Sequence, residues 1–173
     1  MTMINEIFQE SKDNQKIISI RMYGDGDDFW CGFIVDFTNK LVQIQHFSKY
    51  GELDGLVIEE IENIESVDKD NSYCKRLETL VKRNVETNTT ILPSSDNWRV
   101  ELLAKYSELD QVVSIGFVDN LVIISKVISI DNLWIQVQPL TPLGDYDGNS
   151  FYRVENITTV QVSSQEIFRR LKT

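Results

Sequence analysis

The chain has 173 residues, of which 42% are hydrophobic and 25% are charged, so it can hold one domain or two small ones, and wholesale disorder is excluded. Its formal net charge of −10 opposes binding to nucleic-acid phosphates and is compatible with a basic partner or with solubility alone. No run of about 18 apolar residues is present, so we expect no membrane span.

The N-terminal segment, residues 2–12, has apolar residues at helical spacing and predicts a short helix. It lacks a basic start followed by an apolar run, so we expect no signal peptide. The only cysteines, Cys31 and Cys74, are far apart and form no CxxC pair. We interpret them as reduced thiols in a cytoplasmic protein.

The rest of the first half alternates short apolar stretches with turns of Gly, Asp and Asn, which is typical of strands in a small β-protein. The predicted strands cover residues 17–23, 29–37, 41–47, 56–61 and 63–67. A helix is predicted over residues 72–84, with Tyr73, Leu77, Leu80 and Val81 along one stripe.

The second half follows the same order. Residues 86–96 are polar and include Pro93, as expected of a linker. The elements predicted after it are a helix over 97–110, strands over 112–118, 121–130, 133–140, 150–154 and 156–160, and a helix over 163–173. The sequence thus predicts a mainly β chain with helices, of α+β class, with domains at 1–88 and 89–173.

The two halves also repeat each other in sequence. Shifted by 93 positions, residues 33–67 align with 126–160 without a gap, and 10 of the 35 pairs are identical. The identical pairs include Gly51/Gly144, Asp54/Asp147, Gly55/Gly148, Asn63/Asn156 and Ile64/Ile157. This regular self-similarity predicts an internal duplication.

Two of the repeated stretches resemble motifs of the Sm-like family of small SH3-type barrels. GFIVDFTNKLV (32–42) and VISIDNL (127–133) are similar to its first motif, and IENIESV (61–67) and VENITTV (154–160) to the last half of its second. The resemblance implies two tandem five-stranded barrels, each flanked by a helix, and RNA binding. Both copies lack the Arg-Gly pair that helps form the family's RNA pocket, and the acidic charge disfavours RNA.

One loop, YGDGDDFW at residues 23–30, has no counterpart in the second half. Acidic residues next to aromatic residues favour binding to an Arg- or Lys-rich peptide, through ion pairs and cation–π contacts. In the alternative interpretation, Phe29 and Trp30 are core residues and the acids form a solvated turn. The candidate binding residues are Tyr23, Asp25, Asp27, Asp28, Phe29 and Trp30.

No catalytic residue, metal site or cofactor is predicted. His46 is the only histidine, and Pro139 occupies its place in the second half, so we expect a partly exposed strand residue. GDYDGNS (144–150) resembles the start of a calcium loop, but Ser150 and Asn156 stand where that loop needs Gly and Glu. We therefore expect a hairpin turn there.

These observations together favour a non-enzymatic, acidic binding module that engages a protein or peptide, with a basic one as the candidate partner. Two alternatives stay open. The first is an RNA-binding protein of the Sm-like family. The second is an acidic protein of immunity type, which neutralises a toxin by masking its basic surface.

Overall fold

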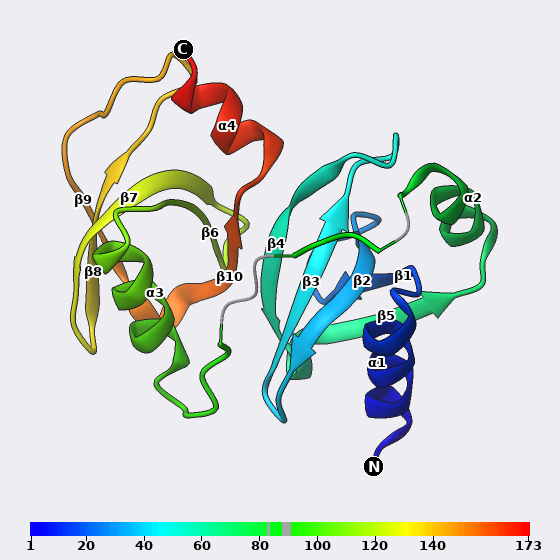
Figure 1. The fold of residues 1–173 in the computed structure, drawn as a ribbon. Coiled ribbons are helices and arrows are strands. Elements are labelled where there is room, and N and C mark those ends of the chain that lie inside the picture. Colours follow the sequence, from blue (N-terminus) through cyan, green and yellow to red (C-terminus); the bar gives the residue numbers. More distant parts are fainter. Residues whose placement is uncertain (83, 88–90) are drawn as a thin grey trace. The chain divides into compact units, whose positions relative to one another are not determined.

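The computed structural model describes residues 1–82, 84–87 and 91–173. The chain divides into two compact units, Met1–Ile91 and Leu92–Thr173 (Figure 1). The predicted boundary between residues 88 and 89 lies outside the described residues. Each unit runs helix, five strands, helix, so the predicted mainly β, α+β class is confirmed. No helix within these ranges is long and apolar enough to cross a membrane.

The first unit begins and ends with a capped helix. The Thr2 hydroxyl accepts a hydrogen bond from Asn5 N, and the Asn71 side chain accepts one from Cys74 N at 2.8 Å, which satisfies amides that have no partner within the helix. Its elements are α1 (Met3–Asn14), β1 (Ile18–Met22), β2 (Trp30–Phe37), β3 (Leu41–Phe47), β4 (Leu53–Glu60), the 3-10 helix η1 (Ile61–Asn63), β5 (Ile64–Lys69) and α2 (Ser72–Leu80).

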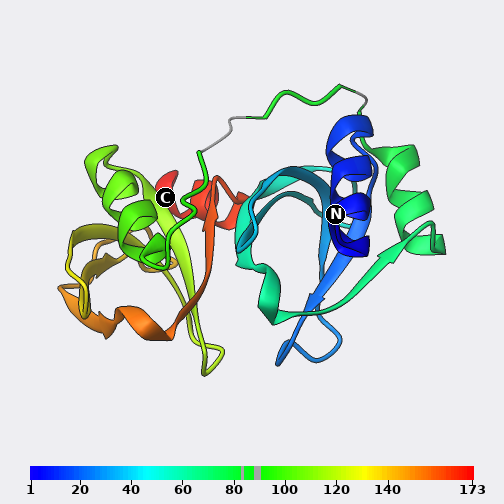
Figure 2. The same ribbon diagram turned by 90° about the horizontal axis from the view of Figure 1, so that it is seen from below.

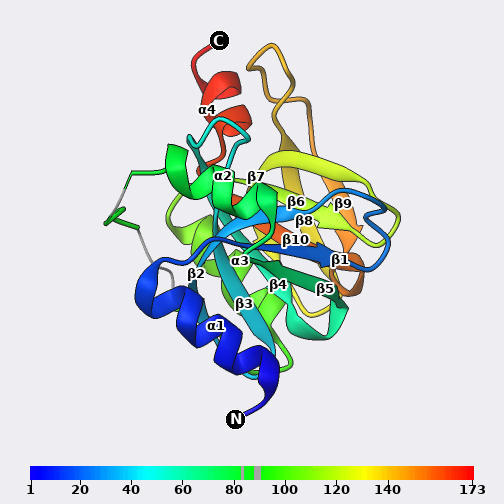
Figure 3. The same ribbon diagram turned by 90° about the vertical axis from the view of Figure 1, so that its right-hand side faces the viewer.

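Helix α1 packs along β2 and covers the core of this unit (Figure 3). The fully buried Ser11 joins the two elements, because its hydroxyl donates to Lys16 O at 2.7 Å and accepts from Ile34 N at 2.9 Å. The core cluster consists of Phe8, Ile18, Ile20, Met22, Ile34, Val42, Ile44 and Val57. The apolar face predicted for the first helix therefore supplies part of the core.

The second unit repeats this arrangement with a helix on β7. Four side chains of its first helix are buried, and the Ser107 hydroxyl donates to Val127 O at 2.9 Å. Its elements are α3 (Trp98–Glu108), β6 (Val112–Phe117), β7 (Val122–Ile130), β8 (Trp134–Pro139), β9 (Ser150–Arg153), the 3-10 helix η2 (Val154–Asn156), β10 (Ile157–Val162) and α4 (Gln165–Leu171).

The strands do not close into barrels. Their order is β5-β1-β2-β3-β4 in the first unit and β10-β6-β7-β8-β9 in the second, with antiparallel neighbours. A closed barrel needs the first strand of each order to pair with the last, and over the described residues β5 pairs only with β1 and β9 only with β8. The strands form open antiparallel sheet.

The resemblance to tandem Sm-like barrels is therefore wrong for this chain. Short strands separated by tight turns occur in open sheets as well as in barrels, because both use the same local alternation. Closure depends on pairing between strands far apart in sequence, which no local motif specifies. Figure 2 shows that the strands of each unit nevertheless curve strongly.

Bulges at matching places account for this curvature. The register of β2 against β3 shifts between Ile34 and Asp36, and that of β7 against β8 shifts between Val127 and Ser129. An extra residue on one strand increases local bend and twist. The two bulges lie 93 positions apart, like the repeat in the sequence. That the units arose by duplication stays a prediction.

Candidate functional site

The acidic loop predicted to bind a partner joins β1 to β2 and extends past both strands (Figure 3). Its backbone is a defined turn, because Asp28 N donates to Asp25 O at 3.1 Å and both Gly24 and Gly26 have positive φ. Tyr23 is 66% exposed, and Asp27 and Asp28 are exposed. The loop is thus an ordered acidic projection.

The aromatic residues of this loop face different partners. The Trp30 indole packs against the core, and its Nε1 donates to Glu59 Oε1 at 2.9 Å. Phe29 lies edge-on to Tyr73 of α2, with ring centroids 5.1 Å apart. Tyr23 alone among the three is largely open to solvent. The predicted site residues are neighbours along the loop, but the structure does not gather their rings around the carboxylates.

The three carboxylates of the loop carry uncompensated charge. Asp25, Asp27 and Asp28 form no ion pair with any cation in the described parts of the chain. Partial burial raises the pKa of Asp25, and the neighbouring Asp28 raises it further. Neighbouring like charges create a local negative potential, which favours an external cation.

His46 has a structural environment. Its Nδ1 accepts a hydrogen bond from Cys31 N at 3.1 Å, and its ring lies edge-on to Trp30 with centroids 5.0 Å apart. Burial lowers the pKa of His46, although Asp54, whose Oδ2 lies 3.9 Å from Nε2, opposes the shift. The imidazole is therefore neutral at pH 7, and its place on β3 as a half-buried strand residue is confirmed.

The two cysteines meet in the fold, although they are far apart in sequence. Cys31 of β2 and Cys74 of α2 are buried free thiols that lie near enough for each to influence the pKa of the other. Burial raises the pKa of both thiols, and a thiol with a raised pKa is a poor nucleophile and metal ligand. No group of three or more His, Cys, Asp or Glu side chains within the described ranges is placed to hold a metal ion.

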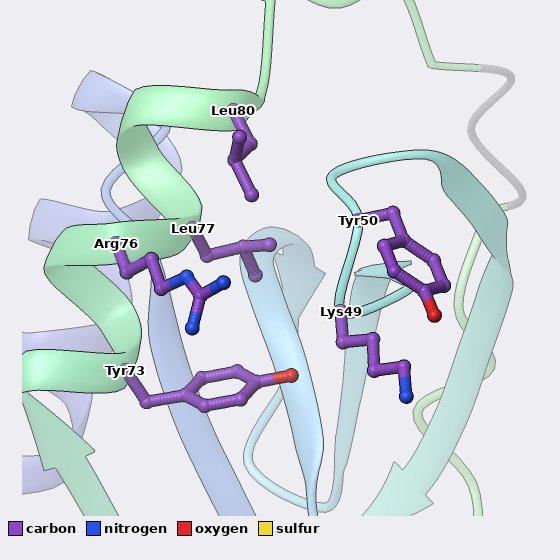
Figure 4. A pocket seen from close by; sticks show the side chains of 6 residues that line it. All are labelled: Lys49, Tyr50, Tyr73, Arg76, Leu77 and Leu80. Carbon is purple, nitrogen blue, oxygen red and sulfur yellow. The ribbon is translucent and has the colours of Figure 1, made fainter.

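A surface hollow of the first unit lies between α2 and the loop that joins β3 to β4. Its volume is about 480 Å³. Figure 4 shows side chains of α2 extending toward the loop, whereas the side chains of Lys49 and Tyr50 extend from the loop in the direction away from α2. We call this hollow the α2 groove; its lining residues are Lys49, Tyr50, Tyr73, Arg76, Leu77 and Leu80.

The α2 groove combines apolar surface with positive charge. Leu77 is buried at 2% exposure, whereas Leu80 is 47% and Tyr50 68% exposed. The Lys49 ammonium lies 5.1 Å from the centroid of the Tyr50 ring. Neither Lys49 nor Arg76 forms an ion pair with a carboxylate in the described part of the chain. In a chain with a net charge of −10, this groove presents two cations to solvent.

Sequence reasoning missed most of this groove. It predicted Tyr73, Leu77 and Leu80 as an apolar stripe of a helix, and the structure confirms that they share one side of α2. It did not single out Lys49, Tyr50 or Arg76. The feature that could have indicated the groove is the narrow apolar stripe of α2. Three apolar residues in a nine-residue helix form a face that the core buries only in part and that a partner can cover.

No protein-family model matches the chain, and neither a curated protein nor a solved structure matches it significantly.

Proposed function

We propose that the chain is a non-enzymatic binding module whose first unit engages a segment of another protein. The observation that carries this proposal is the α2 groove, where partly exposed Tyr and Leu side chains adjoin unpaired cations. Tyr and Arg are enriched among the residues that contribute most to protein–protein affinity. A surface with those residues around a hollow suits a projecting side chain of a partner.

The absence of an enzymatic role is part of the proposal and is supported by the state of the reactive residue types. His46 is neutral and engaged with the backbone of Cys31. The thiols of Cys31 and Cys74 are buried, with raised pKa. General acid–base or nucleophilic catalysis needs such groups exposed in a cleft with a pKa near the working pH.

A cytoplasmic location is also proposed. Two neighbouring buried thiols stay free in this structure, and a reducing compartment is where such a pair persists. Fractionation of cells that produce the tagged full chain, together with trapping of free thiols before lysis, tests this location.

The experiment that tests the binding role uses the full chain as bait in native lysate, followed by mass spectrometry. A matched bait carries Tyr50→Ser and Leu80→Ser, which remove exposed apolar surface from the α2 groove without touching the buried Leu77. We expect specific partners on the first bait to be depleted on the second. Identical partner sets on both baits would move the binding surface elsewhere.

A second candidate function is recognition of a basic protein or peptide by the acidic loop. The observation that favours it is the cluster of three loop carboxylates, Asp25, Asp27 and Asp28, which form no ion pair with a cation among the described residues. An immunity-type protein would use such a surface to mask a basic enzyme. RNA is the less favoured partner, because phosphate contacts need clustered Lys and Arg.

A further inference from the structure

We propose that the α2 groove binds an extended peptide segment in which a carboxylate side chain adjoins a large apolar side chain. The carboxylate pairs with Arg76, with Lys49 of the same groove adding positive potential, and the apolar side chain lies over the exposed part of Leu80. This inference rests on the proposed binding function and names the chemistry of the partner.

The positive charge of the groove favours a negatively charged side chain on the partner. An arginine presents five N–H donors in a fork that matches a carboxylate. Arg76 projects from α2 toward the loop that carries Lys49 (Figure 4), so an incoming carboxylate meets the guanidinium donors in a groove whose other wall carries a second cation. Because neither cation has a carboxylate partner in the described ranges, the incoming group displaces no internal ion pair.

The second unit shows what a satisfied arginine looks like at the corresponding position. The sequence shift of 94 that aligns Leu77 with Leu171 matches Arg76 with Arg170. The capping residues Asn71 and Ser164 instead align the two helices at a shift of 93, which matches Arg76 with Arg169, and Arg169 also pairs with Glu166. Arg170 Nε donates to Glu166 Oε1 at 2.9 Å, and its Nη1 donates to Leu140 O at 2.7 Å.

The carboxylate that pairs with Arg169 and Arg170 has no counterpart on α2 near Arg76. Glu166 corresponds to Ser72 at the shift of 94 and to Tyr73 at the shift of 93, and neither is a carboxylate. Lys49 and Tyr50 correspond to Pro142 and Leu143 at the shift of 93. The first unit therefore lacks the carboxylate that occupies the arginine in the second, and it carries a further cation and an aromatic ring on the facing loop.

The shape of the groove favours a peptide over a small metabolite. Sites for small molecules enclose most of their ligand, whereas the walls of this groove are themselves open, with Tyr50 at 68% and Tyr73 at 36% exposure. A volume of about 480 Å³ accepts one or two side chains. Two cations on a chain of net charge −10 are too few to hold a phosphate backbone, whose affinity grows with each neutralised phosphate.

The test is selection of a random 12-residue peptide library, displayed on phage, against the full chain. Selected peptides are then synthesised and titrated by calorimetry, and the affected residues are located by amide chemical shifts. We expect enrichment of peptides with Asp or Glu beside Leu, Phe or Tyr, and shifts at Lys49, Tyr50 and Arg76.

The decisive variant is Ser72→Glu, which places a carboxylate four residues before Arg76, as Glu166 stands before Arg170. An acidic residue at the first position of a helix is favourable, so the fold is retained. We expect the selected peptides to bind about tenfold more weakly or worse, since a charge-assisted hydrogen bond is lost. Lys75→Gln, on the same helix but outside the groove lining, changes the net charge equally and should leave affinity within about twofold.

The outcomes separate the inference from the proposed function. If enriched peptides are basic, and their binding is lost in the Asp25→Asn, Asp27→Asn, Asp28→Asn variant, the binding function stands and the groove inference is overturned. If no peptide is enriched, both are overturned. Equal loss in Ser72→Glu and Lys75→Gln would mean general charge repulsion and would also overturn the inference, as would tighter binding of an oligo-uridine RNA than of any peptide.

Discussion

Gly51 packs directly against Leu80, and no other residue fits there without a shift. A Cβ atom at position 51 would lie 2.7 Å from Leu80 Cβ, and the φ of Gly51 is +79°. The same relationship occurs in the second unit, where a Cβ at Gly144 would lie 2.8 Å from Arg170 O. The repeated glycine thus lets the third turn of each unit approach the end of its last helix, and in the first unit this approach forms one wall of the α2 groove.

Gly51→Ala should destabilise the first unit by about 2–4 kcal/mol, because left-handed backbone strain adds to the clash with Leu80. Gly24→Ala is the matched control. The φ of Gly24 is +87°, but nothing lies within 4 Å of the added Cβ, so we expect this variant to lose only about 1 kcal/mol of stability. Denaturant unfolding of the full chain measures both. Equal losses in the two variants would contradict the close packing of the loop on α2.

Protonation of His46 should destabilise the fold as the pH decreases. The folded-state pKa of His46 is lowered by burial, so the unfolded chain binds the proton more tightly. The contribution of neutral His46 to the free energy of unfolding is complete above the ordinary histidine pKa of 6.5. It is lost as the pH falls below that value, by at most about 1.4 kcal/mol per pH unit. Urea midpoints between pH 7.5 and 5.5 measure this loss.

The control for that measurement is His46→Asn, whose side-chain oxygen preserves an acceptor near Cys31 N. Its stability should change less between pH 7.5 and 5.5 than that of the unmodified chain. Asp70 and Glu166 have pKa values lowered by their cationic partners, so their contributions are lost at more acidic pH. An equally steep pH dependence in both proteins would exclude His46 as its source.

The thiols of Cys31 and Cys74 should react slowly with a disulfide reagent in the native chain. Burial raises the pKa of both, so reaction requires local opening, and each 1.4 kcal/mol of opening free energy slows it about tenfold. We expect at least about 100-fold slower reaction than in denaturant. Thr79→Cys, at an exposed position of α2, provides a fast-reacting thiol for comparison. Native reaction as fast as at position 79 would contradict the burial.

Ser11→Ala should cost about 1–3 kcal/mol, since the buried Ile34 amide then loses its acceptor. Ser95→Ala is the control. The Ser95 hydroxyl donates to Glu101 Oε1 at an exposed site, and its removal should change the free energy of unfolding by no more than about 0.5 kcal/mol. Thermal and denaturant unfolding distinguish them. A neutral Ser11→Ala would mean that α1 is not attached to β2 through this hydroxyl.

Conversion of Asp25, Asp27 and Asp28 to Asn should leave the free energy of unfolding within about 0.5 kcal/mol of the original value, because these loop carboxylates form no ion pair with a cation among the described residues. Binding of an octalysine peptide should weaken and become less dependent on salt. A control variant removes three exposed carboxylates of the second unit, Glu108, Asp119 and Glu155. If octalysine binding weakens equally in both variants, the loop acts only through the net charge of the chain and is not a specific binding site.

The sequence by itself determined the local elements. The predicted strand at 41–47 is β3 (Leu41–Phe47), because alternation of side chains and the flanking turns are set by neighbours along the chain. The stripe of Tyr73, Leu77 and Leu80 likewise follows from the helical period. Gly51 was predicted as a turn residue, and its positive φ confirms that prediction.

Only the tertiary structure decided how these elements meet. Whether five strands close into a barrel depends on pairing between the first and last of them, which local patterns leave open, and here they stay open. The proximity of Cys31 to Cys74 and the shared lining of the groove by Lys49 and Arg76 join residues from separate elements. That Arg170 is paired while Arg76 is not depends on which side chains the fold brings within a few ångströms, because hydrogen bonds and ion pairs act only over that range.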